Sequence, residues 1–437
     1  MVIRKISYYR VIVSLCLFMF LLSPVFGDEI SAVSFDKELP ENNIVTIQPD
    51  SLRILHNPLT GWVLYASMGV DAADFWAQYD HMYIPELGHN VSVTDYAHTL
   101  YIRASWTDFN PQEDVYGWKI DSNLRAYIEG AYQRNMRLAF RVVVDSRDKR
   151  TEFTPQFVKD AGAKGFMNKG KWSPYSDDSV FQKYYTKFVK ALAKDFNDPS
   201  KVEFIDGFGL GKWGEYHTMI YSTGDDTPKK AVFDWVTDIY SQAFDKVPVV
   251  INYHRWIGAG KDWVDDEHFA ADSEEMLEEA IKKGYSLRHD AFGMTTYYGS
   301  WERRFAKKYR NICPIIMEGG WIVKSHSYWQ DPRGYRKDSH EDVRRGEFDD
   351  SKEAHVNMMD FRFGDTESWF KDAFDLVRRF LREGGYRLYP SEISLPLEVS
   401  KKTTPTIKHC WNNMGWGYCP TTVSYTHLRA HETPEHL

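Results

Sequence analysis

Cysteine is scarce in this chain, and the short motifs that organise metal sites are missing. Only four cysteines occur among 437 residues. Neither a Cys-x-x-Cys pair nor a His-Glu-x-x-His sequence is present, so a structural zinc is not indicated. No Gly-x-Gly-x-x-Gly turn follows an early strand, which argues against an open, doubly wound nucleotide-binding sheet. No cofactor is therefore expected.

Blocks of positive charge are also absent. The formal net charge is −8 and no run of Lys and Arg stands out, so a nucleic-acid partner is not expected. Aromatic residues, by contrast, make up 16% of the chain. Sugar rings present apolar CH faces that stack on such side chains, which favours a carbohydrate ligand. An aromatic-rich core explains the same composition equally well.

The first residues have the pattern of a secretory signal peptide. Basic residues precede an apolar run from Val11 to Leu22, and a polar stretch begins at Asp28. The run is shorter than the roughly 20 residues that a membrane anchor needs, and Cys16 lacks the small residues of a lipoprotein signal before it. We expect cleavage near Gly27, a secreted or periplasmic protein of a bacterial cell envelope, and no membrane insertion afterwards.

The opposite end lacks strand alternation and helical periodicity over residues 423–437. It resembles a translated sequencing adapter, so we exclude it from fold reasoning. Before this tail, Cys410 and Cys419 flank a short loop. The sequence leaves open whether they form a disulfide or remain free thiols. Cys313 lies in an apolar strand and is expected to be a buried thiol.

Short β-rich runs alternate with amphipathic stretches along the central part of the chain. In the stretch 229–244, for example, Val232, Val236 and Tyr240 recur at helical spacing. The other helices are expected at 122–134, 179–195, 273–283, 300–309 and 367–382, and the strands at 61–65, 99–106, 137–144, 202–208, 248–253, 291–296, 313–317 and 355–359.

Eight strands with intervening helices predict an α/β fold, a (β/α)₈ TIM barrel. An open sheet uses the same alternation, but chemistry at many strand ends at once favours the closed barrel. We expect the barrel to span residues 28–384, with a long insertion at 324–351 on its rim, and the start of a β-sandwich domain to occupy residues 385–422.

Two glutamates carry the chemical prediction. Glu215 follows the fourth predicted strand among four glycines and beside Trp213, a setting that raises the pKa of a carboxylic acid towards that of a general acid. Glu318 ends the seventh strand before two glycines, where an ionised carboxylate can attack an anomeric carbon. Two such carboxylates at the ends of barrel strands are what glycosidic bond hydrolysis requires.

Several other strand-end side chains are expected to bind substrate. Arg103 is the expected positive neighbour of Glu318, although a structural ion pair is an equal alternative, and Tyr298 is the expected hydrogen-bond donor. Trp106 and Trp321 are the expected stacking platforms, with core packing as the alternative. The remaining predicted contacts are Asp145, His217, Asn252 and Asn357.

These motifs carry a family resemblance. The order of the two glutamates is similar to that of clan A glycoside hydrolases, the retaining TIM-barrel enzymes, and the stretch 103–118 looks like the second-strand motif of their β-galactosidase-like members. The sequences NPLTGW from Asn57, GLGKWGEYH from Gly209 and GYRLYP from Gly385 resemble a group of secreted bacterial proteins that join such a barrel to a C-terminal β-domain.

The resemblance implies a covalent glycosyl-enzyme, formed on Glu318 with Glu215 as acid and base, and a carbohydrate substrate. This chain departs from the family pattern at Gly214, where many clan A barrels place an Asn that contacts the sugar 2-hydroxyl. Asn252, His217 and Asn357 are alternative sources of that contact. The competing interpretations are a non-catalytic carbohydrate-binding barrel and a metal-dependent hydrolase.

Overall fold

The computed structural model describes residues 42–147, 151–260, 267–293, 297–320, 340–397 and 406–420. The predicted signal peptide, the adapter-like tail and Trp321 all lie outside these residues. Contact clustering divides the chain into two units. The larger comprises Ile47–Ser391 and Cys410–Leu437, and the smaller comprises Met1–Thr46 and Glu392–His409.

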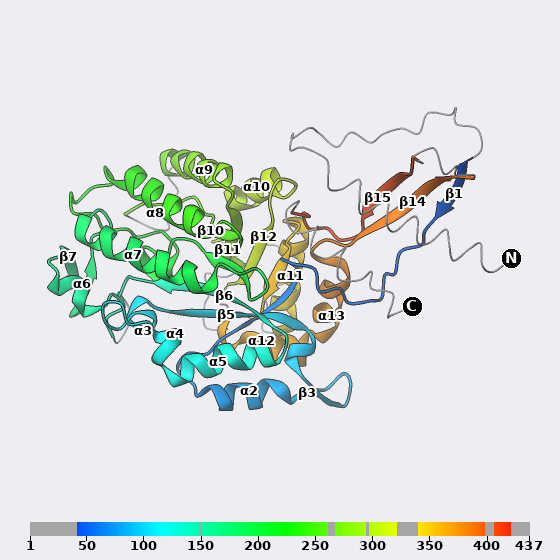
Figure 1. Ribbon diagram of the computed structural model, residues 1–437, viewed down its shortest axis with the longest axis horizontal. Helices are drawn as coiled ribbons and strands as arrows, with labels where there is room; N and C mark the ends of the chain where they lie inside the picture. Colours follow the sequence, from blue (N-terminus) through cyan, green and yellow to red (C-terminus); the bar gives the residue numbers. More distant parts are fainter. Residues whose placement is uncertain are drawn as a thin grey trace, which may run out of the picture. The chain divides into compact units, whose positions relative to one another are not determined.

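A closed barrel of eight parallel strands forms the centre of the larger unit (Figure 1). This confirms the predicted fold class. Each strand pairs with two neighbours, and the last strand pairs with the first through Met358 and Gly61. In chain order the strands are β2 (Gly61–Tyr65), β5 (Ala97–Ser105), β6 (Arg137–Val143), β9 (Val202–Asp206), β10 (Val249–Asn252), β11 (Ser286–Phe292), β12 (Ile315–Gly319) and β13 (Met358–Asp360).

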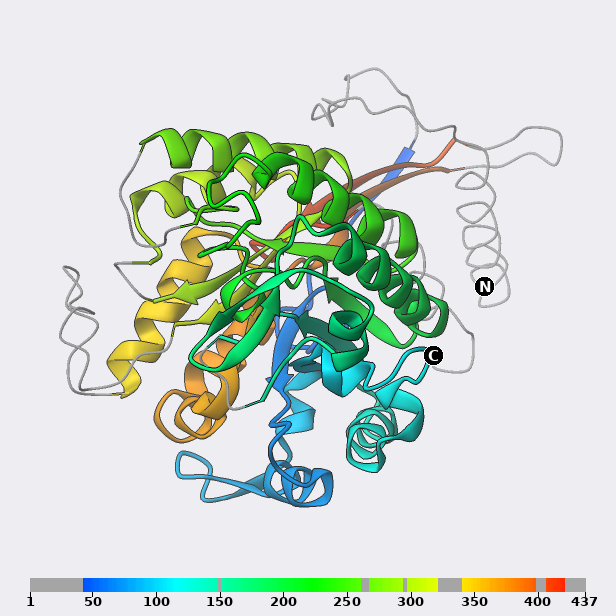
Figure 2. The same cartoon turned by 90° about the vertical axis from the view of Figure 1, so that its left-hand side faces the viewer.

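In the view turned by 90°, helices are seen around the strands of the barrel (Figure 2). A few begin with a side chain that accepts from a free N–H group of the first turn, such as Asp178, which accepts from the Phe181 N–H at the start of α7. The principal helices are α2 (Ala72–Asp80), α5 (Ser122–Gln133), α7 (Ser179–Phe196), α8 (Lys229–Ala243), α9 (Glu267–Lys282), α10 (Ser300–Tyr309), α11 (His340–Glu353), α12 (Arg362–Asp372) and α13 (Phe374–Glu383). Shorter helices are α3 (Trp106–Phe109), α4 (Gly117–Ile120) and α6 (Gln156–Asp160).

Two predicted elements differ from the structure. The sixth barrel strand, β11, begins at Ser286 and ends at Phe292, so the predicted range 291–296 started too late. The charged residues within β11 hid its alternation. The single helix predicted at 367–382 is two helices, because the backbone at Ala373 leaves the helical region at φ −147°.

The interior of the barrel is apolar at its lower level. Residues that alternate inward on the strands form one buried cluster: Leu59, Val63, Tyr65, Tyr101, Ala139, Phe204, Val250, Ile316 and Met358. A parallel strand sends every second side chain to the same face, so the next inward position on each strand lies one level nearer the carboxyl end. That level is where the charged residues lie.

The amino-terminal end of the barrel, which we call the floor, is contacted by residues 415–418. The Asn357 side chain donates to the Tyr418 carbonyl at 2.7 Å and accepts from the Tyr418 N–H at 3.1 Å. The Trp416 indole donates to the Val356 carbonyl at 2.9 Å. A Cβ added at Gly417 would stand 2.7 Å from backbone atoms of Gly385, so only glycine permits this close approach.

Three strands outside the barrel form an antiparallel sheet in the order β1, β14, β15. They are β1 (Asn42–Thr46), β14 (Leu388–Pro396) and β15 (Lys408–Asn413), and β1 pairs with β14 from Asn42 opposite Pro396 to Thr46 opposite Glu392. The larger unit also contains two small antiparallel hairpins. They are formed by β3 (Met82–Ile84) with β4 (His89–Val91) and by β7 (Gly165–Asn168) with β8 (Lys171–Pro174). Cys410 is a free, exposed thiol on β15, so the disulfide with Cys419 is not formed.

No helix in the part of the chain that the structure describes is both long enough and apolar enough to cross a membrane.

Candidate active site at the carboxyl end of the barrel

A layer of charged side chains lies directly above the apolar layer of the barrel. The period of two places Arg141 above Ala139, Asp206 above Phe204, Glu318 above Ile316 and Asp360 above Met358. These four side chains are at most 4% exposed. Burial of this many charges is tolerable only when each is paired and hydrogen-bonded, so their contacts determine the site.

Arg141 connects two strands and the loop that follows one of them. Its Nε lies 2.6 Å from Asp206 Oδ2, and its Nη1 lies 2.6 Å from Asp290 Oδ2. The same Nη1 lies 3.5 Å from Glu215 Oε1. Asp206 also accepts from the Tyr101 hydroxyl at 2.7 Å, which holds its carboxylate beneath the guanidinium.

Arg288 connects Asp290 to two further carboxylates, those of Glu318 and Asp360. Its Nη2 lies 2.5 Å from Glu318 Oε2 and 2.9 Å from Asp360 Oδ2, and its Nε lies 3.0 Å from Asp290 Oδ1. Asp290 therefore lies between the two arginines, one on each of its oxygens. Guanidinium groups suit this position because their donors form a rigid fork that matches carboxylate geometry.

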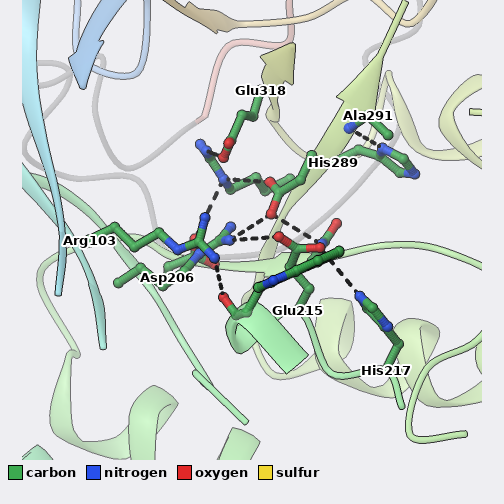
Figure 3. A network of polar contacts seen from close by, with 12 residues as sticks. Arg103, Asp206, Glu215, His217, His289, Ala291 and Glu318 are labelled. Atoms are coloured by element: carbon green, nitrogen blue, oxygen red, sulfur yellow. Dashed lines mark hydrogen bonds and ion pairs between the residues drawn. The ribbon is translucent and has the colours of Figure 1, made fainter. Parts of the chain in front are cut away.

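The contacts join the two glutamates into one network. It runs from Glu215 through Arg141, Asp290 and Arg288 to Glu318. Figure 3 shows both glutamates directed at this group of side chains, Glu318 from its strand and Glu215 from the loop after β9. Carboxylates from the fourth and seventh barrel strands are thus brought to one place, at the end of a TIM barrel where active sites are found.

The loop that carries Glu215 is held by its own backbone and by two histidines. His254 Nε2 lies 2.7 Å from the Glu215 carbonyl, and His254 Nδ1 accepts from the Trp256 N–H at 3.1 Å, which fixes the Nε2–H tautomer. Burial and the neighbouring His217 keep the pKa of His254 well below its ordinary value. His217 Nε2 lies 3.4 Å from Glu215 Oε2.

The environment of Glu318 favours a bound proton. Burial raises its pKa to about 8, and the nearby Asp290 and Asp360 add to the effect against the opposing charge of Arg288. Burial likewise raises the pKa of Asp360 to about 6. Asp290 behaves in the opposite way, because Arg141 and Arg288 outweigh its burial and hold its pKa far below the usual range.

Arg103 lies within electrostatic range of both glutamates. Burial opposes its charge, but Tyr65, Glu215 and Glu318 outweigh burial and raise the pKa of its guanidinium. Its Nη2 donates to the Trp213 carbonyl at 2.9 Å and its Nη1 to the Tyr65 hydroxyl at 3.3 Å. Within the described part of the chain it forms no ion pair, so the alternative of a structural pair does not apply here.

Three other predicted contacts lie near the carboxyl ends of their strands with partners of their own. Asn252 donates to Asp290 Oδ2 at 3.3 Å and so belongs to the network. Asp145 is occupied by Arg147, whose Nη2 lies 2.5 Å away. Tyr298 is buried against Phe292, with ring centroids 4.3 Å apart, and its hydroxyl accepts from Tyr253 instead of reaching Glu318.

The structure does not bring Trp106 and Asn357 to the site. Trp106 is fully buried among Phe157, Phe181, Tyr185 and Phe188, so it packs in the core and is not a stacking platform. Asn357 precedes β13 on the floor and binds backbone groups there. The predicted eighth strand, 355–359, included Asn357, whereas β13 begins only after it, at Met358.

Sequence reasoning missed the residues that connect the glutamates. Arg141 and Arg288 stand inside strands, where a charge argues against burial, and β11 itself was placed too late for Arg288 and Asp290 to be noticed. For Arg141 the available signal was the period of two, because it lies two positions after the apolar, inward-facing Ala139. Arg288 and Asp290 had no such signal, since Ser286 precedes Arg288 at that spacing and Arg288 precedes Asp290. Among the described residues, no three His, Cys, Asp or Glu side chains form a group that fits a metal ion.

The comparisons with known proteins found similarity among solved structures only. No protein-family model and no curated protein matches the chain. Among solved structures, endo-glycoceramidase II from Rhodococcus sp. is 12% identical with a TM-score of 0.43, over 76% of this chain and 79% of that one. Xylanase B from Clostridium stercorarium F9 is 12% identical with a TM-score of 0.38, over 69% and 85% of the two chains. A psychrophilic family 10 endo-β-1,4-xylanase is 10% identical with a TM-score of 0.43, over 72% and 96%.

Proposed function

We propose that this protein is a secreted glycoside hydrolase that cleaves β-linked poly- or oligosaccharides by a retaining, double-displacement mechanism. The observation that carries the proposal is the network that joins Glu215 to Glu318 at the carboxyl end of the barrel. Glycosidic hydrolysis needs two carboxyl groups at one sugar-sized site, and a buried charged network holds both of these rigidly.

We assign Glu318 as the nucleophile because it is fixed by a short contact from Arg288 on a barrel strand. Its attack forms the bond to the anomeric carbon while the bond to the leaving oxygen breaks. Glu215 is assigned as the acid that protonates this oxygen. Glu215 then takes a proton from water, which attacks the anomeric carbon and releases Glu318.

The raised pKa of Glu318 has a kinetic consequence under this assignment. Only the ionised form attacks, so kcat/KM should rise with pH up to about 8 as the fraction of ionised Glu318 grows. Arg103 and Arg288 favour the ionised form, whereas Asp290 and Asp360 oppose it. If the roles were reversed and Glu318 were the acid, kcat/KM would fall over the same range.

The proposal is tested with 4-nitrophenyl and 2,4-dinitrophenyl β-glycosides of common hexoses and pentoses. Glu318→Gln should lower kcat by at least about 1,000-fold on both leaving groups. Glu215→Gln should retain measurable turnover of the dinitrophenyl substrates, whose leaving group needs no proton, and azide should yield a β-glycosyl azide. Glu129→Gln, an exposed position on α5, is the matched control.

Three outcomes would contradict the proposal. Full activity in either glutamate variant would discard the role assignments. A wild-type protein that binds oligosaccharides without hydrolysing any of the substrates would support the non-catalytic alternative. Loss of activity on chelation, with both glutamate variants active, would indicate the metal-dependent hydrolase. Proton NMR of the anomer formed first distinguishes retention from inversion.

A further inference from the structure

Trp213 occupies a backbone conformation that large residues rarely adopt. It has φ 60° and ψ 5° within the short turn η2 (Lys212–Gly214), between Gly211 at φ 73° and Gly214 at φ 76°. A left-handed conformation is strained for a residue with a side chain, whereas glycine adopts it freely. A tryptophan at this position is therefore held at a cost that glycine would avoid.

The other left-handed residues of this loop have structural explanations. Tyr216, at φ 59°, is fully buried and packs on Phe208 and Phe233. Thr218, at φ 52°, places its hydroxyl 2.8 Å from His217 Nδ1. For Trp213 the backbone contact gives no reason for the side chain, because the carbonyl that accepts from Arg103 is present in every residue type.

The indole of Trp213 is instead presented beside the predicted acid. Its ring is only partly buried. It meets the His217 ring edge to face, with centroids 5.6 Å apart, and His217 lies 3.4 Å from Glu215. Lys212 Nζ lies 4.2 Å from the indole centroid, so an ammonium group occupies one face and fixes the orientation of the ring.

We propose that Trp213 is a stacking platform for a sugar ring in the leaving-group position of the substrate. This inference rests on the proposed function, in which Glu215 protonates the leaving oxygen. A ring adjacent to that acid contacts the departing part of the substrate, and an indole offers a broad, rigid apolar surface to a pyranose face. The substrate class is therefore a di- or oligosaccharide, and not a glycoside of a small alcohol.

The test compares two substrate types that differ only in the leaving group. β-Linked disaccharides place a sugar ring on the platform, whereas the matching glycosyl fluoride places only fluoride there. The α- or the β-fluoride is used, according to which one the wild type accepts. Trp213→Gly should lose at least about 10-fold more kcat/KM on the disaccharide than on the fluoride. Trp213→Phe, which keeps an aromatic ring, should lose less.

A stability measurement separates binding from folding. Trp213→Gly should raise Tm because glycine relieves the left-handed backbone. The matched control is Asn135→Gly, which also replaces a left-handed residue, at φ 56°, but on the exposed end of α5 away from the site. It should leave the ratio of the two kcat/KM values at the wild-type level.

Two results would overturn the inference while leaving the proposed function in place. One is an equal loss on both substrates in Trp213→Gly, and the other is no loss on either. A wild-type protein that is inert on both substrate types would overturn the proposed function and this inference with it.

Discussion

The two ends of the barrel are built on opposite principles. At the carboxyl end, five carboxyl groups meet Arg141 and Arg288 in one buried network. At the floor, the Asn357 amide and closely packed glycines hold residues 415–418 against the ends of the strands, and a single ion pair, Arg137 with Glu203, lies beside them. The carboxyl end therefore holds paired charges at the candidate active site. The floor closes the core mainly with hydrogen bonds to main-chain groups.

This difference explains why similar polar residues have different meanings at the two ends. Asn252 and Asn357 are both buried asparagines next to a barrel strand. Asn252 donates to Asp290 and so takes part in the charged layer, whereas Asn357 satisfies main-chain groups of Leu59 and Tyr418. Position along the strand decides between site and scaffold, because in TIM barrels the chemistry gathers at the carboxyl ends.

The largest effect is expected from removing the cation at the centre of the charged end. Arg288→Met should lower the free energy of unfolding by about 3–5 kcal/mol, because Glu318, Asp360 and Asp290 would lose a shared partner. Urea denaturation followed by circular dichroism measures this change. Arg382→Met, at an exposed position on α13, is the control. If Arg288→Met were as stable as the wild type, the shared contacts of Arg288 would not stabilise the fold.

A smaller but still large effect is expected at the floor. Asn357→Ala should lower the free energy of unfolding by about 2–3 kcal/mol, because it leaves buried main-chain groups of Leu59 and Tyr418 without partners. Its kcat/KM at a temperature well below Tm should stay within about 3-fold of the wild-type value. A selective loss of activity in a stable variant would break the distinction between the two ends.

The pH dependence of stability should separate the ends as well. The pKa of Glu318 is about 8 in the folded protein against 4.5 for an ordinary glutamate. Between these values the folded state holds a proton that the unfolded state has released, so its contribution to stability is full below about pH 4.5 and is lost by about pH 8. Glu318→Gln should therefore unfold a few degrees higher than the wild type at pH 8 and at a similar temperature at pH 5, as measured by calorimetry.

Asp290 acts in a separate window. Asp360, with its pKa raised to about 6, titrates within the window of Glu318 in wild type and variant alike, so the difference between the two proteins is the quantity to compare. The depressed pKa of Asp290 contributes stability above the ordinary aspartate value of 3.8 that is lost as pH falls below it. A Glu318→Gln profile parallel to that of the wild type from pH 5 to 8 would contradict the assignment of the proton to Glu318.

The smallest effect is expected at Trp106. Trp106→Phe should change the free energy of unfolding by about 1 kcal/mol, because the ring is buried but its indole N–H has no partner among the described residues. KM should not change, since this residue packs in the core. A raised KM with unchanged stability would restore Trp106 as a substrate contact.

Much of the architecture could be predicted because strand and helix periods are local properties. The barrel strands around Val63, Phe204 and Ile316 have apolar inward positions that identify them directly. The positions of Glu215 and Glu318 followed from the same periods, since each comes at the end of such a strand. β11 could not be recognised in this way, because Arg288, His289 and Asp290 interrupt its apolar residues.

The contacts within the site were beyond sequence reasoning. The interaction of Arg288 with Glu318 and Asp360 joins three strands, and nothing in the local sequence states which inward positions share a level. The partial exposure of Trp213 and the burial of Trp106 were equally inaccessible, because each tryptophan follows an apolar strand and the sequence does not state where its ring points. Backbone conformation distinguishes them, and that is a property of the folded chain.

The Asn357 contacts with Tyr418 also impose an order on biosynthesis. Asn357 is synthesised 61 residues before Tyr418, so its amide side chain lacks these two contacts until Tyr418 has left the ribosome. Domains emerge from the ribosome amino-terminus first, and sealing of this barrel depends on a segment that follows all eight of its strands. Nascent chains halted shortly before Trp416 should therefore remain sensitive to protease at the base of β13.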